Sequence, residues 1–464
     1  MSRLVVVSNR VGSTREAAST GGLAVALIEA LRDSGGLWFG FSGKTARSGT
    51  RKPEVVAEDG FTLATLNLPV DEFQGYYSGY ANGCLWPICH FRPDLIQFER
   101  THFDAYRQVN RRFAQALAPL LRPDDLIWVH DYHLIPLAHE LRALGVRQRI
   151  GFFLHIPFPP PDLLDALPEH EALLHWMLDY DLVGFQTQHD RLQFQHCIAH
   201  NGGWISDHTV EAHGQSVQAG AYPIGIDARQ FHALSTSPAG AREFRRMRDA
   251  LHGRAQIIGV DRLDYSKGLL RRVHAVEALF DRHPHTRSRV EFLQIAPLSR
   301  HQLKAYDDFR HALESAAAQV NGRFAQFDWT PVRYLNRPLP RRTLAGLYRA
   351  SRIGLVTPLR DGMNLVAKEF VAAQDPEDPG VLVLSRFAGA ATQLDAALLV
   401  NPYDCGEVAD ALETALSMPR AQRRDRHARM MSVLVEQDAA KWRADFLRDL
   451  RGARATRSGK RRAR

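Results

Sequence analysis

The sequence predicts an α/β fold with two Rossmann-like, doubly wound domains that face each other across a cleft. Short apolar runs rich in Val, Ile and Phe alternate with helix-like patterns, and continuous apolar strands between helices are typical of a parallel sheet covered on both faces. The runs form two series, one ending near Pro223 and one starting near Gln256, so two sheets are expected. Open sheets of this kind bind ligands at the carboxyl ends of their strands.

Each series supplies four predicted strands. The first consists of Leu4–Ser8, Leu126–His130, Ile150–His155 and Asp181–Gln186; the second consists of Gln256–Val260, Val290–Ala296, Ile353–Pro358 and Val381–Ser385. A polar, helix-prone connection with turn residues at 235–240 separates the two series. The predicted domains are therefore residues 1–235 and 236–437, followed by a helix at 438–450 and a basic tail at 451–464.

Charge and composition exclude several classes of protein. The chain has 464 residues and a net charge of +8, but the tail 451–464 carries seven Lys and Arg and no acidic residue, which leaves the body nearly neutral. Specific nucleic-acid binding is therefore not expected, and the tail is expected to be disordered. No apolar stretch reaches the 18 or so residues of a membrane span, and the N-terminal apolar run is too short for a signal peptide. The four cysteines form no C-x-x-C pair, so a cytoplasmic protein with reduced thiols is expected.

Three apparent motifs do not meet the requirements of their chemistry. Gly43-Lys44-Thr45 resembles the end of a P-loop, but position 38 is Trp rather than the required Gly. In the zinc-protease-like run from His170-Glu171 to His175 the histidines are five residues apart, so they do not share a helix face. The histidines of HDYHL (130–134) lack companion ligands in the sequence, so no metal site is predicted.

Polar residues follow the predicted strands of the first half. Arg10 ends the first strand, and Gly21-Gly22 opens a predicted helix whose N–H groups could face a phosphate, although a glycine pair is also a common turn. Asp131 follows the second strand, where a carboxylate can accept hydrogen bonds from sugar hydroxyls or simply cap a helix. His155 precedes a proline-rich run that forms either a preorganised site or a plain rigid connection.

The second half places two cations in one strand-to-helix loop. Arg262 and Lys267 follow the strand 256–260, and a diphosphate leaving group requires positive partners of this kind. The run 357–369 leads from another strand into a helix, whose first N–H groups would face a phosphate. Glu369 on that helix would accept hydrogen bonds from ribose hydroxyls, or it is an ordinary surface carboxylate.

Eight motifs, taken together in order and spacing, resemble one family. The chain closely resembles the trehalose-6-phosphate synthases, retaining glycosyltransferases of the GT-B type, over about residues 1–450. The motifs are VSNR (7–10), GGL (21–23), LWP (85–87), HDYHL (130–134), HIPFP (155–159), RLDYSKG (262–268), TPLRDGMNLVAKE (357–369) and NPYD (401–404).

The resemblance implies an activity. The family transfers glucose from a nucleotide sugar, usually UDP-glucose, to glucose 6-phosphate and forms α,α-trehalose 6-phosphate, the first step of trehalose biosynthesis and part of a stress response. It implies no metal or other cofactor, an acceptor site in the first domain, a nucleotide site in the second, and a helix at 438–450 that crosses back to the first domain. A homo-oligomer is also expected.

The resemblance also implies roles for individual residues. For the acceptor these are Arg10 and Arg300 on the phosphate, Tyr77 and Asp131 on the phosphate or sugar, and Trp86 and His155 shaping the pocket. For the donor they are Gly21, Gly22, Arg262 and Lys267 at the diphosphate, Asp361, Gly362, Met363 and Asn364 at the transferred glucose, and Leu365, Val366, Ala367, Lys368 and Glu369 at the nucleotide. The expected catalytic set is Asp131, His155, Arg262, Lys267 and Asp361.

One departure affects the donor base. The loop around Leu339, Arg337–Pro340, is proline-rich where relatives often carry an aromatic residue, and in the family this loop contacts the nucleobase. GDP-glucose and ADP-glucose are therefore alternatives to UDP-glucose.

The sequence leaves alternatives open for the mechanism of retention and for the functional class of the protein. Retention can proceed through a covalent glycosyl-enzyme, with Asp131 or Asp361 as nucleophile, or through front-face attack, which the resemblance favours. A transferase that uses glycerol 3-phosphate or a cyclitol phosphate, a non-catalytic regulatory subunit and a phosphorylase are the competing classes. The donor-site cations argue against the regulatory subunit, and the chain is too short for a phosphorylase with its pyridoxal-phosphate lysine.

Overall fold

The computed structural model describes residues 2–11, 22–50, 52–298 and 304–453 and divides the chain into two compact units. Unit 1 comprises Met1–Pro223 and Trp442–Arg464, and unit 2 comprises Ile224–Lys441. Unit 2 thus begins before the predicted boundary at 236, because helices α10 (Ala228–Thr236) and α11 (Pro238–Leu251) pack on the helices of unit 2. No helix in the described ranges has the length and apolar character that crossing a membrane requires.

Unit 1 is built on a ten-stranded sheet with the order β3-β4-β2-β1-β5-β6-β7-β10-β9-β8. Its centre is parallel, and antiparallel strands occur only at the two edges. The strands are β1 (Leu4–Arg10), β2 (Leu37–Ala46), β3 (Glu54–Glu58), β4 (Phe61–Pro69), β5 (Leu126–His130), β6 (Arg149–Phe153), β7 (Leu182–Phe185), β8 (Trp204–Ser206), β9 (Thr209–Ala212) and β10 (Gln215–Ala221).

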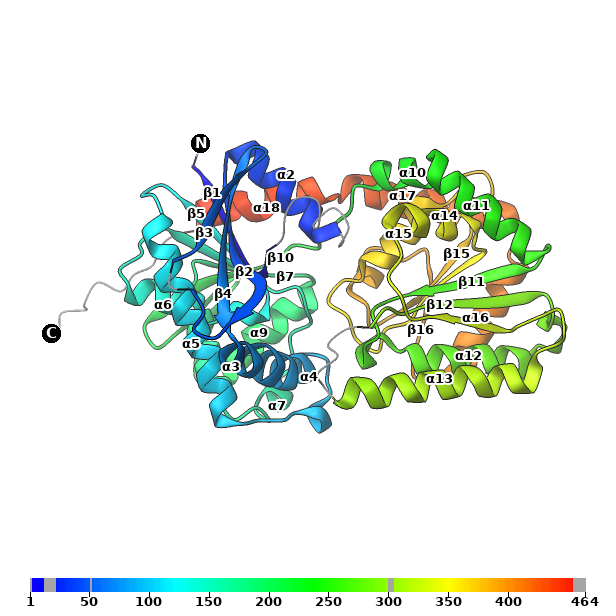
Figure 1. The fold of residues 1–464 in the computed structure, drawn as a ribbon, viewed down its shortest axis with the longest axis horizontal. Helices are drawn as coiled ribbons and strands as arrows, with labels where there is room; N and C mark the ends of the chain where they lie inside the picture. Colours follow the sequence, from blue (N-terminus) through cyan, green and yellow to red (C-terminus); the bar gives the residue numbers. More distant parts are fainter. Residues whose placement is uncertain (1, 12–21, 51, 299–303, 454–464) are drawn as a thin grey trace. The chain divides into compact units, whose positions relative to one another are not determined.

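Helices cover both faces of this sheet (Figure 1). The alternation of side chains along a strand assigns the faces, because Gly184 on β7 packs against α18 while its neighbour Phe185 packs against Phe194 of α9. The α-helices described in unit 1 are α2 (Gly22–Ser34), α3 (Val70–Phe73), α4 (Trp86–Cys89), α5 (Arg100–Leu117), α6 (Leu137–Ala143), α7 (Pro161–Leu164), α8 (His170–Met177), α9 (Gln188–His200) and, from Trp442 onward, α18 (Ala439–Gly452), with a π-helical segment at Gln74–Leu85.

The last helix packs on unit 1 through an apolar stripe. Trp442, Phe446 and Leu450 recur every four residues and are 2%, 0% and 0% exposed. The Phe446 ring stacks on Trp128 with centroids 4.7 Å apart and fits over Gly151, where a Cβ would come within 2.9 Å of the ring. The helix extends to Gly452, and the following Ala453 is buried, so the ordered chain continues past the predicted end at 450. The remainder of the predicted tail lies outside the described residues.

Unit 2 contains a fully parallel six-stranded sheet with the order β13-β12-β11-β14-β15-β16. Numbered from the first strand of this unit, the order is 3-2-1-4-5-6, which is the dinucleotide-binding Rossmann order. The strands are β11 (Ala255–Val260), β12 (Val290–Ile295), β13 (Val332–Leu335), β14 (Ile353–Val356), β15 (Val381–Ser385) and β16 (Leu398–Val400).

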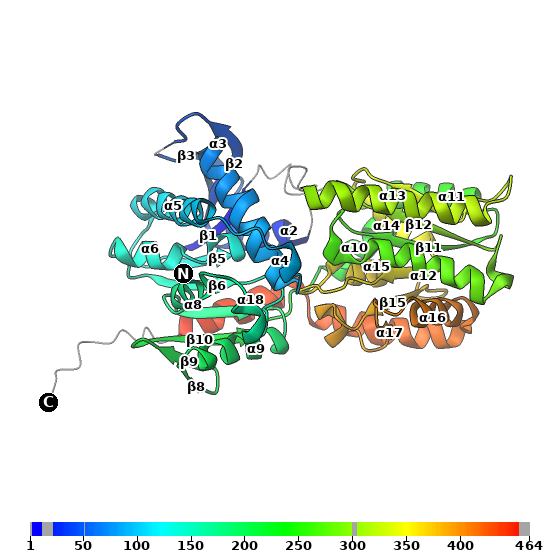
Figure 2. The ribbon, with the colours of Figure 1, turned by 90° about the horizontal axis from the view of Figure 1, so that it is seen from below.

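Two helical layers enclose the sheet of unit 2, as the two views show (Figures 1 and 2). One layer holds α10, α11, α14 (Arg341–Ala350), α15 (Leu365–Ala373) and α17 (Arg420–Glu436). The other holds α12 (Leu269–Arg282), α13 (Lys304–Phe324) and α16 (Cys405–Ser417). The core consists of the apolar strands and stripes such as Leu269, Val273, Val276 and Phe280 on α12.

The eight strands predicted from apolar runs are all present, and the two-sheet α/β prediction is confirmed. The eight remaining strands were not predicted. β2 and β4 are long, but Gly, Ser, Thr or Asn residues interrupt their apolar residues. The other six are short, more polar or at a sheet edge, as with the exposed residues 54–57 of β3.

Candidate functional site

The strongest polar cluster of unit 2 lies at the point where its strand order reverses. Strands β11 and β14 are neighbours there, and both are followed by loops that carry predicted site residues. Connections leave such neighbours in opposite directions, which opens a crevice at their carboxyl ends. The two loops are tied together, because the Leu359 N–H donates to the carbonyl of Ser266 at 2.8 Å.

A short helical turn fixes the loop after β11. Asp264 caps a 3-10 turn over Tyr265–Lys267 by accepting from the Ser266 N–H at 3.0 Å and the Ser266 hydroxyl at 2.9 Å. Its other carboxylate oxygen accepts from the Tyr306 hydroxyl at 3.1 Å. In the motif Asp-Tyr-Ser-Lys-Gly, the Asp264 cap thus fixes the turn that carries Lys267.

Gly268 ends this turn in a conformation that only glycine adopts readily. Its φ is +69°, and a Cβ there would lie 2.3 Å from the carbonyl oxygen of Thr357 at the end of β14. The close approach brings the loops after β11 and β14 together, so the glycine is required by packing as well as by backbone conformation.

Lys267 and Asp361 form an ion pair between these two loops. Lys267 Nζ donates to Asp361 Oδ2 at 2.5 Å, and both side chains are nearly buried. The same oxygen accepts from Asn364 Nδ2 at 3.0 Å. The Asn364 Oδ1 in turn caps α15 by accepting from the Ala367 N–H at 3.2 Å. The structure therefore brings together Lys267, Asp361 and Asn364, three of the predicted donor residues.

Behind this pair lies a buried arginine that the sequence analysis missed. Arg272 on α12 is 1% exposed and donates to Asp261 at 2.7 Å, to the Thr357 hydroxyl at 3.0 Å and to the Lys267 carbonyl at 3.1 Å. Burial raises the pKa of Asp261, although Arg272 and Lys267 oppose that shift. The sequence contained one sign of this burial, because Arg272 lies between Leu269 and Val273 on the apolar stripe of α12.

Two buried charges on α15 have different partners. Glu369 lies 3.4 Å from Arg341 at the start of α14, and burial raises its pKa to about 6 although Arg341 lowers it. Lys368 donates instead to the carbonyl of Ile224 at 2.5 Å and to Gln393 at 2.6 Å, and burial lowers its pKa to about 7. The Lys368 side chain thus anchors the start of unit 2.

The remaining predicted donor residues lie in loops of unit 2 or in the first turn of α15. Arg262 is exposed at the end of β11, and Leu339 is half-buried in the loop before α14. Gly362 and Met363 are buried, with the Met363 carbonyl accepting from the Ala390 N–H at 2.8 Å. Leu365, Val366 and Ala367 form the first turn of α15.

In unit 1, Asp131 occupies a strained position between β1 and β6. Its φ of +76° and ψ of 162° are rare for a residue with a side chain. Its N–H donates to the Phe153 carbonyl at 2.8 Å, and its carboxylate accepts from the N–H groups of Tyr132 at 3.1 Å and His155 at 3.4 Å. Backbone bonds from two strand ends therefore hold this carboxylate at the carboxyl edge of the sheet.

His155 belongs to a pair of neutral histidines. Its Nε2 lies 3.0 Å from His130 Nδ1, so one ring donates and the other accepts. Burial lowers the pKa of His155 to about 3, and it lowers the pKa of His130 as well. At neutral pH both rings are uncharged hydrogen-bonding groups.

The aromatic residues of the predicted acceptor site lie on the segment that follows β4. Tyr77 stacks between Phe73 at 5.1 Å and His133 at 5.6 Å, and the buried Trp86 stacks on His90 at 4.0 Å. His133 thus contacts Tyr77 while His130 faces His155, so the HDYHL histidines do not converge on one ion.

The other predicted residues of this half lie at the end of β1 or beyond the described ranges. Arg10 is exposed, with its guanidinium against Gly43, and Gly22 opens α2. Gly21 and Arg300 lie outside the described residues.

Two Rossmann-like units, one with a cation and carboxylate cluster at its switch point, define a GT-B glycosyltransferase. The comparison with family models specifies the class further. Residues 3–452 match the model of "Glycosyltransferase family 20", and the chain belongs to that family.

Individual relatives cover nearly the whole chain. It is 48% identical over 455 residues to the trehalose-6-phosphate synthase of Escherichia coli (strain K12), covering 97% of this chain and 95% of that protein. An α,α-trehalose-phosphate synthase (UDP-forming) from Burkholderia vietnamiensis has a TM-score of 0.96 and 49% identity over 98% of this chain and 97% of that one. The corresponding enzyme from Burkholderia xenovorans, in complex with glucose 6-phosphate, has a TM-score of 0.94 and 48% identity over 97% and 100% of the two chains.

Proposed function

We propose that this protein transfers glucose from UDP-glucose to glucose 6-phosphate with retention and forms α,α-trehalose 6-phosphate. The observation that carries the proposal is the Lys267–Asp361 pair at the switch point of a Rossmann sheet, in a chain of family 20. The similarity to UDP-forming synthases, one of them bound to glucose 6-phosphate, supports the choice of substrates.

Lys267 and Arg262 are the proposed partners of the donor diphosphate. As the sugar bond breaks, negative charge develops on the terminal phosphate, and preorganised cations stabilise that charge more than they stabilise the ground state. Lys267 would exchange its bond to Asp361 for one to a phosphate oxygen, which would free Asp361 and Asn364 for sugar hydroxyls. The first-turn N–H groups of α15 would add their dipole.

On the acceptor side, Arg10, Arg300 and Tyr77 are the proposed contacts of the phosphate. His155 would act as a neutral hydrogen-bonding group toward a sugar hydroxyl, since its lowered pKa keeps it uncharged. Asp131 would accept from a hydroxyl, because its carboxylate is already oriented by backbone N–H groups.

Front-face attack is the proposed route to retention. The acceptor oxygen bonds to the anomeric carbon as the bond from that carbon to the phosphate oxygen breaks, and the departing phosphate takes the proton of the acceptor hydroxyl. In this scheme Asp361 accepts a hydrogen bond from a hydroxyl of the transferred glucose, and no covalent glycosyl-enzyme forms on it. No metal is required in this scheme. The proposal also includes a cytoplasmic homo-oligomer, whose mass light scattering would measure.

One matrix of assays tests the proposal. Release of nucleoside diphosphate is measured from UDP-, GDP- and ADP-glucose, each alone and with glucose 6-phosphate, glycerol 3-phosphate or a cyclitol phosphate. We expect release from UDP-glucose that depends on glucose 6-phosphate, and NMR of the product should show both anomeric centres as α. A higher rate with another phosphate acceptor, or a β linkage, would reject the assignment.

A further inference from the structure

A cluster of metal-ligating side chains lies in unit 1, away from the residues discussed so far. His139 on α6, His175 on α8 and Asp179 before β7 each present one ligand atom, and these atoms all lie within 4.8 Å of one another. The three residues are partly buried, and no other such group occurs in the described part of the chain. The cluster and the predicted acceptor residues lie at different ends of the parallel strands. Asp179 precedes the amino end of β7, whereas Asp131 and His155 follow the carboxyl ends of β5 and β6.

The carboxylate at the centre of the cluster is held from two sides. Asp179 Oδ2 lies 2.8 Å from His139 Nδ1, and its other oxygen accepts from the amide of Gln215 on β10. A second hydrogen bond that orients a carboxylate is typical of the outer shell of metal sites.

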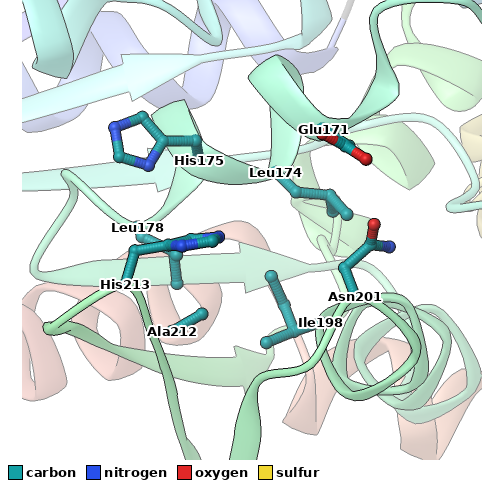
Figure 3. Close-up of a pocket in the computed structure, with 8 residues that line it drawn as sticks. All are labelled: Glu171, Leu174, His175, Leu178, Ile198, Asn201, Ala212 and His213. Atoms are coloured by element: carbon teal, nitrogen blue, oxygen red, sulfur yellow. The ribbon is translucent and has the colours of Figure 1, made fainter.

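A pocket of about 130 Å³ is lined by one residue of the cluster, His175. Figure 3 shows the imidazoles of His175 and His213 at one end of this pocket and the side chains of Glu171 and Asn201 at the other. His213 lies in the two-residue turn between β9 and β10 with a φ of +53°, and its ring centroid is 5.8 Å from that of His175. A third imidazole thus lies next to His175.

The charges around the cluster are mixed. Asp179 brings a negative charge to His139, and Arg142 brings a positive charge to the Asp179 carbonyl at 3.4 Å. Arg107 lies over the Trp176 ring at 5.9 Å. With one carboxylate and two neutral imidazoles as ligands, a divalent ion keeps one net positive charge, which a bound hydroxide or an anion can neutralise.

We propose that unit 1 binds one divalent transition-metal ion of the Zn²⁺ class through His139, His175 and Asp179, with water as the fourth ligand. Imidazole nitrogen and carboxylate oxygen are the preferred non-thiolate ligands of Zn²⁺, at about 2.0–2.2 Å. A tetrahedron of that size needs ligand atoms about 3.4 Å apart, so small side-chain rotations complete the site. The ion would link α6 to the end of α8 and stabilise unit 1 without taking part in glucosyl transfer.

Metal titration of the tag-free, EDTA-treated and dialysed full chain tests the proposal. Zn²⁺ binding is measured by calorimetry, and Co²⁺ binding by the visible absorption that tetrahedral coordination makes intense. The wild type should bind one equivalent of each ion, and saturating Zn²⁺ should raise its melting temperature. His175→Ala and the nearly isosteric Asp179→Asn should each weaken Zn²⁺ binding at least tenfold and abolish the intense Co²⁺ bands.

The matched control is His200→Ala, which removes a histidine of the same unit that pairs with Asp165 at 3.0 Å outside the cluster. It should bind Zn²⁺ like the wild type. Circular dichroism of every variant verifies folding, and Asp179→Asn keeps the test valid if His175→Ala fails to fold. Absence of a saturable one-to-one site in the wild type, or equal affinity in all these proteins, would overturn the proposal.

Discussion

Lys267 Nζ lies 2.5 Å from Asp361 Oδ2, although 94 positions separate the two residues in the chain. The pair joins the loop after the first strand of the second Rossmann sheet to the loop after its fourth strand. The ion pair therefore lies at the crevice where this kind of sheet binds its ligand.

Lys267→Ala should lower kcat/KM by about 30- to 1000-fold, the equivalent of about 2–4 kcal/mol of transition-state stabilisation, because one preorganised cation is lost. The fold should be retained, since the lysine lies in a loop. Steady-state kinetics measure the loss. The control is Lys441→Ala, which removes a lysine of unit 2 that lies outside the proposed donor site. Wild-type kinetics in a folded Lys267→Ala protein would remove Lys267 from the donor site.

Gly268→Ala tests whether the close approach of the two loops matters. The variant combines a positive φ with a Cβ 2.3 Å from the Thr357 carbonyl, whereas Gly253→Ala has a φ of +84° and no atom within 4 Å. Gly253→Ala should lose about 1–2 kcal/mol of stability, the cost of placing a Cβ at a positive φ, and should keep its activity. Gly268→Ala should be less stable and far less active. Equal stability and activity of the two variants would show that the contact with Thr357 is unimportant.

Arg272→Met should destabilise unit 2 by about 3–5 kcal/mol, because it leaves the buried Asp261 without its charged partner. Adding Asp261→Asn to this variant should recover much of that loss. Denaturant unfolding of the two single variants and the double variant gives the coupling energy. If the two losses simply add, the buried pair does not act as a unit.

Glu369 predicts a pH dependence of stability with a defined sign. Its pKa is raised to about 6 in the folded protein, so between the ordinary value of Glu and pH 6 the folded state binds more protons than the unfolded state. The contribution of Glu369 to stability therefore falls as pH rises through this window and stays low above it. The loss amounts to about 2 kcal/mol. Glu369→Gln should gain stability relative to the wild type between pH 4.5 and 7, as measured by denaturant midpoints. A pH-independent difference would contradict the shift.

Chelation tests the proposed role of the donor-site cations. Excess EDTA should leave glucosyl transfer unchanged, because Arg262 and Lys267 take the place of a divalent ion at the diphosphate. Loss of activity that only Mg²⁺ or Mn²⁺ restores would reject that scheme. Zn²⁺ release from the His139, His175 and Asp179 cluster would appear in the melting temperature and not in the rate, which separates the two sites experimentally.

The sequence by itself determined the eight apolar strands, the two-sheet class and the family. Continuous apolar runs such as Leu4–Val7 and Val381–Leu384, repeated between helical patterns, are typical of buried parallel strands. Motifs such as Asp-Tyr-Ser-Lys-Gly carry their own local geometry of cap and left-handed glycine. Local sequence suffices in these cases, because the interactions involved span only a few residues.

Only the tertiary structure decided which charges meet. The sequence contains 59 Lys and Arg and 51 Asp and Glu, and nothing local says that Lys267 pairs with Asp361, that Arg272 is buried against Asp261, or that Lys368 points at the Ile224 carbonyl. His175, whose zinc-protease spacing fails in the sequence, instead meets His139 and Asp179. The Lys267–Asp361 contact arises where β11 and β14, which are distant in sequence, become neighbours in a sheet. The other contacts form where helices and loops pack on a sheet, and this packing depends on the burial of the whole chain rather than on any segment of it.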